Sequence, residues 1–188
     1  MLRWKYAFSA FTLAACLAAP LYAGSASFSL SSSEIKPGQT LAAAQVFSGF
    51  GCEGGNQSPA LSWTAGPEGT RSYALTVYDP DAPTGSGWWH WVVYNIPASV
   101  TQLEAGAGDV SSTRLPAGAL HGRTDFGSHA FGGACPPVGD KPHRYIFTVY
   151  ALKTEKLDVP ADASAALIGY MINANKLAKA TFTAKYAR

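Results

Sequence analysis

The sequence lacks several of the patterns that mark common functions. Only 14% of its 188 residues are charged, and no cluster of Lys and Arg that could follow a nucleic-acid backbone occurs. We therefore expect no nucleic-acid partner. The Gly-x-Ser-x-Gly elbow of many hydrolases is missing, as are the His-x-His and His-x-x-x-His spacings that favour zinc. There is no internal repeat and no low-complexity tract.

A hydrophobic run long enough to span a membrane is also missing. The apolar run from Tyr6 to Leu21 is too short and too poorly flanked for a stable span. It follows Arg3 and Lys5 and is followed by small residues, which is the order of a secretory signal peptide. The sequence therefore predicts a cleaved signal peptide over residues 1–26 and export to the periplasm.

Two features of this N-terminal segment affect the rest of the chain. The stretch from Leu13 to Cys16 resembles a bacterial lipoprotein cleavage box, so a form anchored through Cys16 is the alternative. Without Arg3 and Lys5, twelve basic residues face twelve acidic ones, and the exported protein is expected to be nearly neutral.

Cysteine is scarce as well. The chain has three cysteines, of which Cys52 and Cys135 follow the predicted signal peptide. Export to an oxidising compartment favours a disulfide between them, which would close a loop of about 84 residues. Two free buried thiols are the alternative.

What the chain does contain is a series of short β-rich segments separated by Gly and Pro turns. One helix is expected near the C-terminus, with Asp162 or Ser164 as its N-cap. The fold class is therefore predicted to be mainly β, an antiparallel β-sandwich-like domain over residues 27–188 with a C-terminal helix. The expected strands lie near Ser27–Ser31, Gln45–Phe47, Leu61–Trp63, Tyr73–Val77, Trp89–Tyr94, Arg144–Leu152 and Ala180–Tyr186. The expected apolar face of the helix contains Ala166, Leu167, Tyr170, Met171, Ala174, Leu177 and Ala178.

The segment from Ser72 to Pro97 has an unusual concentration of functional side chains. Asp79 and Asp81 lie on a proline-stiffened turn at the end of one predicted strand, and His90 lies in the next. A rigid scaffold presents polar groups to a ligand in this way. The alternative is a hairpin whose aspartates only cap turns.

A second concentration lies between Phe131 and Tyr145. Gly132 and Gly133 allow backbone N–H groups to converge on one point, which is typical of an anion-binding loop. His143 follows at the start of the next predicted strand, where it can donate to a bound phosphate. The alternative is an ordinary Gly/Pro loop with an exposed histidine.

Together these segments resemble one protein family. Residues 79–83, 87–91, 133–137 and 143–145 have the sequences DPDAP, GWWHW, GACPP and HRY. In this order and spacing they resemble the phosphatidylethanolamine-binding protein family, also called Raf kinase inhibitor proteins. The loop Asn56–Trp63 fits the bacterial YbhB/YbcL branch of that family.

The resemblance implies a non-catalytic binding protein without cofactor or metal, with a small pocket for phosphate or a phosphorylated head group. It also suggests a homodimer. The residues that match the family's pocket are Asp79, His90 and His143, with Gly133 as a backbone donor, Tyr145 in support and Asp81 as a structural neighbour.

The expected pocket has a predicted pH dependence. A carboxylate at Asp79 close to His90 and His143 would raise the pKa of both imidazoles. Phosphate-like anions are then expected to bind more tightly as the pH falls from about 8 to about 6.

Three other functions compete with this one. In the first, the protein inhibits another protein, such as a kinase or a protease, and the pocket is accessory. Trp88, Trp89 or Tyr73 would then form an exposed contact patch, although tryptophans in strands are more often core residues.

The other two are enzymes. Ser58, His90 and Asp79 supply the residue types of a hydrolytic triad, but a serine before proline is more often a turn residue. Asp79, Asp81, His90 and His143 could in principle bind a metal ion, but their spacing matches no common metal motif.

Overall fold

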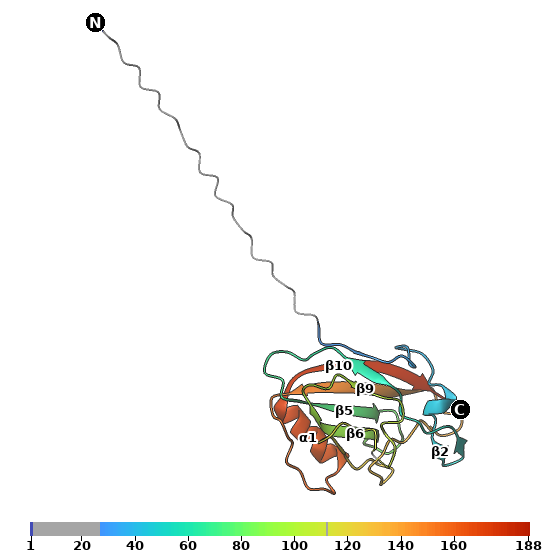
Figure 1. The fold of residues 1–188 in the computed structure, drawn as a ribbon. Coiled ribbons are helices and arrows are strands. Elements are labelled where there is room, and N and C mark those ends of the chain that lie inside the picture. The colour runs from blue at the N-terminus through green and yellow to red at the C-terminus, as the bar shows by residue number, and fades with distance from the viewer. Residues whose placement is uncertain (2–26, 112) are drawn as a thin grey trace.

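The computed structural model describes residue 1, residues 27–111 and residues 113–188 (Figure 1). The predicted signal peptide and lipoprotein box lie outside the described residues, apart from Met1. Within these described ranges, no helix is both long enough and apolar enough to cross a membrane.

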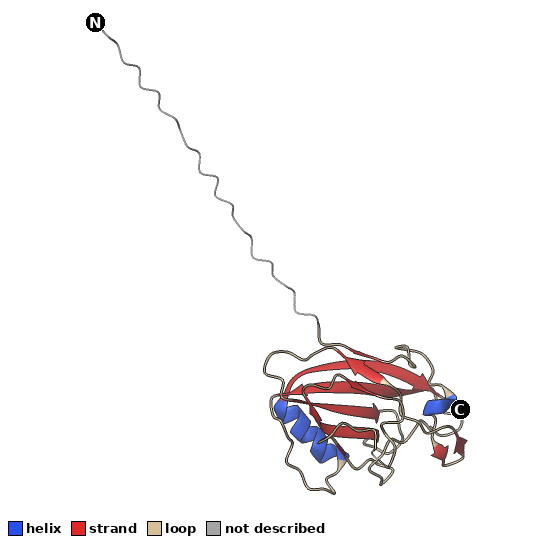
Figure 2. Cartoon of the chain, viewed as in Figure 1, coloured by secondary structure: helices blue, strands red, loops and turns tan. Residues whose placement is uncertain are grey.

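A five-stranded antiparallel sheet forms the centre of the fold (Figure 2). The strands are β5 (Ser72–Asp79), β6 (Trp88–Pro97), β8 (Leu120–His121), β9 (His143–Leu152) and β10 (Lys176–Tyr186). Their spatial order is β10-β9-β5-β6-β8, so β5 lies at the centre, between β9 and β6. The side chains of β5 and β6 are buried almost continuously, as expected for strands that are covered on both faces of the sheet.

A smaller sheet covers one face of the main sheet. It consists of β1 (Leu30–Ser31), β4 (Leu61–Trp63) and β7 (Gln102–Leu103) in the order β1-β4-β7. The inward-facing side chains of both sheets form one hydrophobic core, which includes Leu61, Trp63, Tyr73, Leu75, Val77, Trp91, Val93, Phe147 and Phe182. The predicted mainly β, antiparallel sandwich-like fold with one C-terminal helix is confirmed.

The helix α1 (Ala165–Asn175) packs against the opposite face of the main sheet. Its N-cap is Ser164, whose Oγ accepts a hydrogen bond from the Leu167 N–H at 3.2 Å. The apolar face predicted for this helix is wrong, because Ile168 and Ile172 are buried while Tyr170 is 70% exposed. Apolar residues occur on both sides of α1, so periodicity alone did not determine which side packs.

The segment Ala43–Glu53 differs from the prediction. The expected strand Gln45–Phe47 is wrong, because Ala43–Gln45 forms a single 3₁₀ turn, η1, and Val46 makes only an isolated bridge to Ala134. The following loop contains a small hairpin of β2 (Ser48–Gly49) and β3 (Cys52–Glu53).

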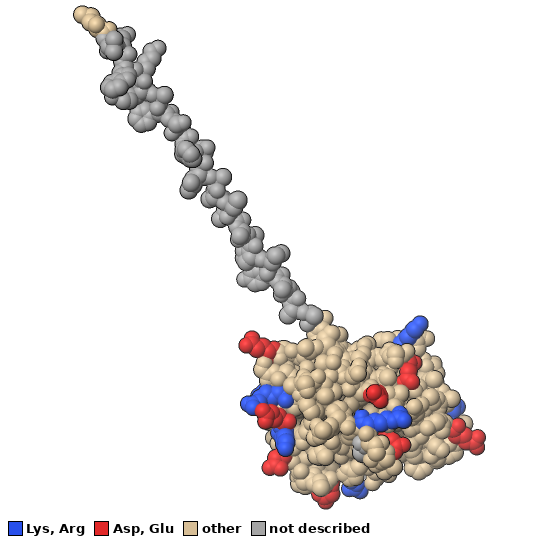
Figure 3. Space-filling view, viewed as in Figure 1, with Lys and Arg blue, Asp and Glu red and all other residues tan. Residues whose placement is uncertain are grey.

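The predicted disulfide between Cys52 and Cys135 is present in the structure, with the two Cα atoms 6.0 Å apart. It joins the β2–β3 hairpin to the Gly/Pro loop that precedes β9. On the molecular face in Figure 3, basic and acidic side chains are interspersed.

Candidate functional site

A cavity of about 190 Å³ opens at one end of the main sheet. Because β5 is antiparallel to both β6 and β9, the end of β5 lies beside the beginnings of the other two strands. This topology brings together Asp79 from β5, His90 from β6, and His143 and Tyr145 from β9, all four of which line the cavity. Sequence analysis singled out all four.

Asp79 and His143 form a buried pair at this inner end. The His143 Nδ1 lies 2.7 Å from Asp79 Oδ2, and both side chains are almost fully buried. On the other side, His143 Nε2 lies 3.3 Å from Asp140 Oδ2. Both imidazole nitrogens therefore face carboxylates, and a protonated ring donates to both.

The charge state of His143 follows from these two carboxylates. Burial lowers its pKa, but the hydrogen bond and charge of Asp79, assisted by Asp140, outweigh this effect and the pKa is raised above its ordinary value. Since both its nitrogens already have partners, His143 balances the charge of Asp79 and has no donor left over for a ligand.

His90 has the opposite environment. Its Nδ1 donates to the Gly132 carbonyl oxygen at 2.7 Å, while Nε2 has no partner among the described residues. Burial lowers the pKa of His90, and this effect outweighs the hydrogen bond to Gly132 and the attraction of Asp79. Asp79 therefore favours the charged form of both histidines, as expected, but the net pKa is raised only for His143, because burial outweighs this attraction at His90.

Tyr145 provides a second polar atom without a partner. The side chain is 1% exposed, and its hydroxyl makes no hydrogen bond to any described residue. Burial raises the pKa of the phenol, so it stays protonated and can donate. Its ring lies edge-on to His90, with centroids 5.1 Å apart.

The other two predicted residues do not line the cavity. The Gly133 N–H donates to Asn56 Oδ1 at 2.7 Å and so already has a partner. Asp81 forms a bidentate ion pair with Arg144, at 2.8 and 2.7 Å, and this hydrogen bonding lowers the pKa of Asp81 to about 2. Asp81 still supports the site, because its N–H donates to Asp79 Oδ1 at 2.8 Å.

Aromatic side chains form the outer part of the cavity. Phe50, Trp88 and Phe126 line it together with Pro136 and Pro137. The Phe126 ring lies 5.4 Å from His90 and 5.3 Å from Trp88 between centroids, edge-on to both. Phe50 and Phe126 were not predicted from the sequence, because each lies in a separate loop and no local pattern links either residue to the histidines.

The competing residue sets are placed differently. Tyr73, suggested for an exposed contact patch, is buried in the core, whereas Trp88 is half-buried at the cavity. Ser58 is buried, and its Oγ accepts from the Gly108 N–H at 2.8 Å outside the cavity. Ser58 therefore forms no triad with His90 and Asp79. In the described ranges, no three His, Cys, Asp or Glu side chains are grouped as metal ligands would be.

The fold and cavity define a β-sandwich protein with a small pocket at one end of its main sheet. The family model for phosphatidylethanolamine-binding protein matches residues 31–187, and the chain belongs to this family. It is 62% identical to the UPF0098 protein YbcL of Escherichia coli K12 over 164 residues, which cover 87% of this chain and 90% of YbcL. It is 48% identical to YbhB of the same organism over 158 residues, which cover 84% of this chain and 99% of YbhB.

The solved structures agree with this assignment. The match to the crystal structure of E. coli YbcL has a TM-score of 0.85 and covers 87% of this chain and 99% of the YbcL chain. The match to a family homologue, CT736 of Chlamydia trachomatis, has a TM-score of 0.70 at 26% identity and covers 86% of this chain and 97% of the CT736 chain.

Proposed function

We propose that the cavity binds a small anion, a phosphate or the phosphate of a larger molecule, in an exported protein that performs no catalysis of its own. The observation that supports this most strongly is the buried hydroxyl of Tyr145 on the inner cavity wall, which has no hydrogen-bond partner among the described residues. A buried polar atom without a partner is unfavourable, and a ligand oxygen would satisfy this hydroxyl while also accepting from Nε2 of a protonated His90 on the same wall.

The cavity has no Lys or Arg among its lining residues, so the charge of the ligand is balanced in another way. His143 is paired with Asp79 and Asp140 through its two ring nitrogens. His90 is neutral without ligand, with its proton on the Nδ1 that faces Gly132. An anion at Nε2 favours the doubly protonated ring, so binding takes up one proton at a pH above the pKa of His90. The affinity then rises by up to about tenfold for each pH unit of acidification.

The predicted direction of the pH effect is unchanged, but its origin differs from the expectation. The proton whose uptake controls binding belongs to His90. His143 is paired with its two carboxylates and is not the group that takes up this proton.

A protein partner is the second candidate. Phe50 is 70% exposed and Val138 is 77% exposed, and Phe50 lies at the cavity mouth. A partner that contacts these side chains would use the pocket as an accessory site, in the manner of an inhibitor. The homodimer stays a prediction.

Calorimetric titration with inorganic phosphate at pH 6 and pH 8 tests the proposal. In buffers of different ionisation enthalpy, we expect proton uptake with binding and a higher affinity at pH 6. His90→Gln should remove the share of the pH dependence that comes from the histidine and leave only that of the ionisation of phosphate itself, and His129→Gln, which changes an exposed histidine outside the cavity, should keep the wild-type dependence. Absence of phosphate binding to the wild-type protein, or an unchanged pH dependence in His90→Gln, would refute it.

A further inference from the structure

The tip of the β2–β3 hairpin has an unusual backbone. The two-residue turn consists of Phe50 and Gly51, with φ angles of 53° and 79°. Both residues are thus in the left-handed region, which such hairpin turns usually fill with Asn, Asp or Gly. A bulky side chain is rare at this backbone conformation, and strain of this kind persists only where the surroundings enforce it.

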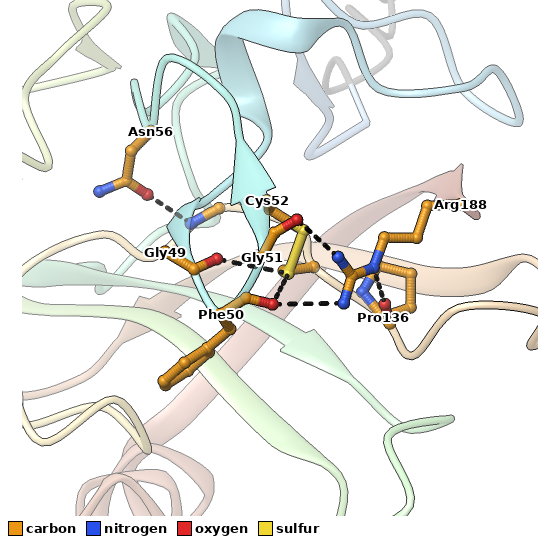
Figure 4. Close-up of a disulfide and its surroundings, with 9 residues drawn as sticks. Gly49, Phe50, Gly51, Cys52, Asn56, Pro136 and Arg188 are labelled. Carbon is orange, nitrogen blue, oxygen red and sulfur yellow. Dashed lines mark hydrogen bonds between the residues drawn. A yellow bond between two sulfur atoms is a disulfide. The ribbon is translucent and has the colours of Figure 1, made fainter.

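Two clamps hold this turn (Figure 4). The disulfide joins Cys52 to Cys135, and the Arg188 guanidinium donates to backbone carbonyls on both sides of that bond. Arg188 Nη1 donates to Gly51 O at 2.9 Å, Nη2 to Phe50 O at 3.3 Å and Nε to Pro136 O at 2.6 Å. The hairpin itself has only two residue pairs, so these clamps determine where its tip lies.

The clamped turn places the Phe50 ring at the cavity mouth. The ring lies 5.3 Å from Phe47 and 6.1 Å from Phe126 between centroids, nearly parallel to Phe126. It lines the cavity, yet the residue is 70% exposed and adds little to the core. Placing a phenyl ring in solvent on a strained backbone does not stabilise the fold. The role of the ring is therefore expected in the cavity, where it can contact a ligand.

We propose that Phe50 is the specificity-determining residue of the site, held in position by Arg188 and the disulfide. The ligand class is then an organic anion whose charged group is attached to a flat apolar ring. The anion lies at His90 and Tyr145, and its ring packs between Phe50, Phe126 and Trp88. This inference rests on the proposed anion site and adds the chemistry of the group attached to the anion.

Phenyl phosphate and inorganic phosphate separate the two claims when both are titrated at pH 6. We expect the wild-type protein to bind phenyl phosphate more tightly. Phe50→Asn should weaken phenyl phosphate about five- to tenfold, as expected for loss of one aromatic contact, and change inorganic phosphate less than about twofold. Because Asn tolerates the left-handed region, the melting temperature should stay the same or rise. Val138→Asn removes another exposed apolar side chain outside the cavity and should change neither affinity.

Arg188→Gln removes the hydrogen bonds that hold the turn but keeps the Phe50 side chain. It should reduce the preference for phenyl phosphate and lower the melting temperature, the opposite of the effect of Phe50→Asn on stability. Arg71→Gln, which removes a surface ion pair with Glu155, is the matched control. An unchanged preference in Arg188→Gln would refute the clamp.

Two outcomes would overturn the inference while the proposed function stands: equal affinity of the wild-type protein for both probes, or equal losses of both probes in Phe50→Asn. Failure of both probes to bind the wild-type protein would refute the anion site and, with it, this inference.

Discussion

His90 and His143 show how strongly single residues depend on their surroundings. Both are buried histidines at the same end of the main sheet, yet the pKa of His90 is lowered and that of His143 is raised. Two carboxylates contact His143, whereas His90 donates to a backbone carbonyl and packs against aromatic rings. Sequence identified both residues but not their charges, because the contacts of His90 with Gly132 and of His143 with Asp79 are made only in the tertiary fold.

These shifts predict opposite effects of the two histidines on stability. For His143, the unfolded pKa is about 6.5 and the folded pKa is higher, so its stabilisation is complete below pH 6.5 and is lost as the pH rises through the folded pKa. For His90, the unfolded chain binds the proton more readily, so stability falls as the pH drops below about 6.5.

Urea unfolding of His143→Gln and His90→Gln between pH 5 and pH 9 measures both effects. The difference in the free energy of unfolding between wild type and variant should become smaller toward high pH for His143→Gln. It should become smaller toward low pH for His90→Gln. His129→Gln, which changes an exposed histidine outside the cavity, serves as the matched control. Differences that change in the same direction for both variants would contradict the assigned charge states.

Tyr145 gives a second prediction at this scale. Removing its partnerless hydroxyl in Tyr145→Phe should leave stability unchanged or slightly increased, because no protein hydrogen bond is lost. Phosphate affinity should fall about tenfold to hundredfold if the hydroxyl donates to the anion. Calorimetry and thermal denaturation measure the two effects, with Tyr94→Phe on the opposite face of the sheet as control. A stable variant with unchanged phosphate affinity would exclude the hydroxyl from the site.

At the scale of elements, strands were predictable where their pattern was supported by clear boundaries. The segments that form β5, β6 and β9 alternate or are rich in β-branched and aromatic residues, and they end at Gly and Pro turns. The segment Gln45–Phe47 pairs through one isolated bridge instead of a ladder. The helix was also predictable, but not its buried face, which the shape of the sheet decides.

Two alanine substitutions test which face of α1 packs. Ile168→Ala should lower the free energy of unfolding by about 2–5 kcal/mol, because Ile168 is buried against the sheet. Leu167→Ala should change it by less than about 0.5 kcal/mol, because Leu167 is 41% exposed. Urea unfolding measures both, and the reverse order would restore the face predicted from periodicity.

The disulfide is the other element-scale feature with a measurable effect. It links residues 83 positions apart, for which the chain-entropy model gives at most about 4.5 kcal/mol. Cys52→Ser with Cys135→Ser should therefore lower the melting temperature and also weaken ligand binding, since Cys135 lines the cavity. Reduction of the wild-type protein should reproduce both losses. Unchanged stability after complete reduction would show that the bond does not support the fold.

At the scale of the whole molecule, the site arises from the order of the strands. The antiparallel order β9-β5-β6 places three strand ends side by side, which unites Asp79, His90, His143 and Tyr145. Short motifs identified this inner part because its residues lie on or next to regular strands. The outer part, with Phe50, Phe126 and Arg188, comes from loops and the C-terminal residue, which only long-range contacts bring together.

The most direct test of the central claim is to observe the histidine ring nitrogens by NMR during a phosphate titration at pH 7. We predict that His90 Nε2 changes from an unprotonated to a protonated nitrogen as phosphate is added. The two His143 nitrogens, which face Asp79 and Asp140, should show no such change. A titration in which phosphate binds and His90 Nε2 stays unprotonated, or in which no ring nitrogen responds, would contradict this account.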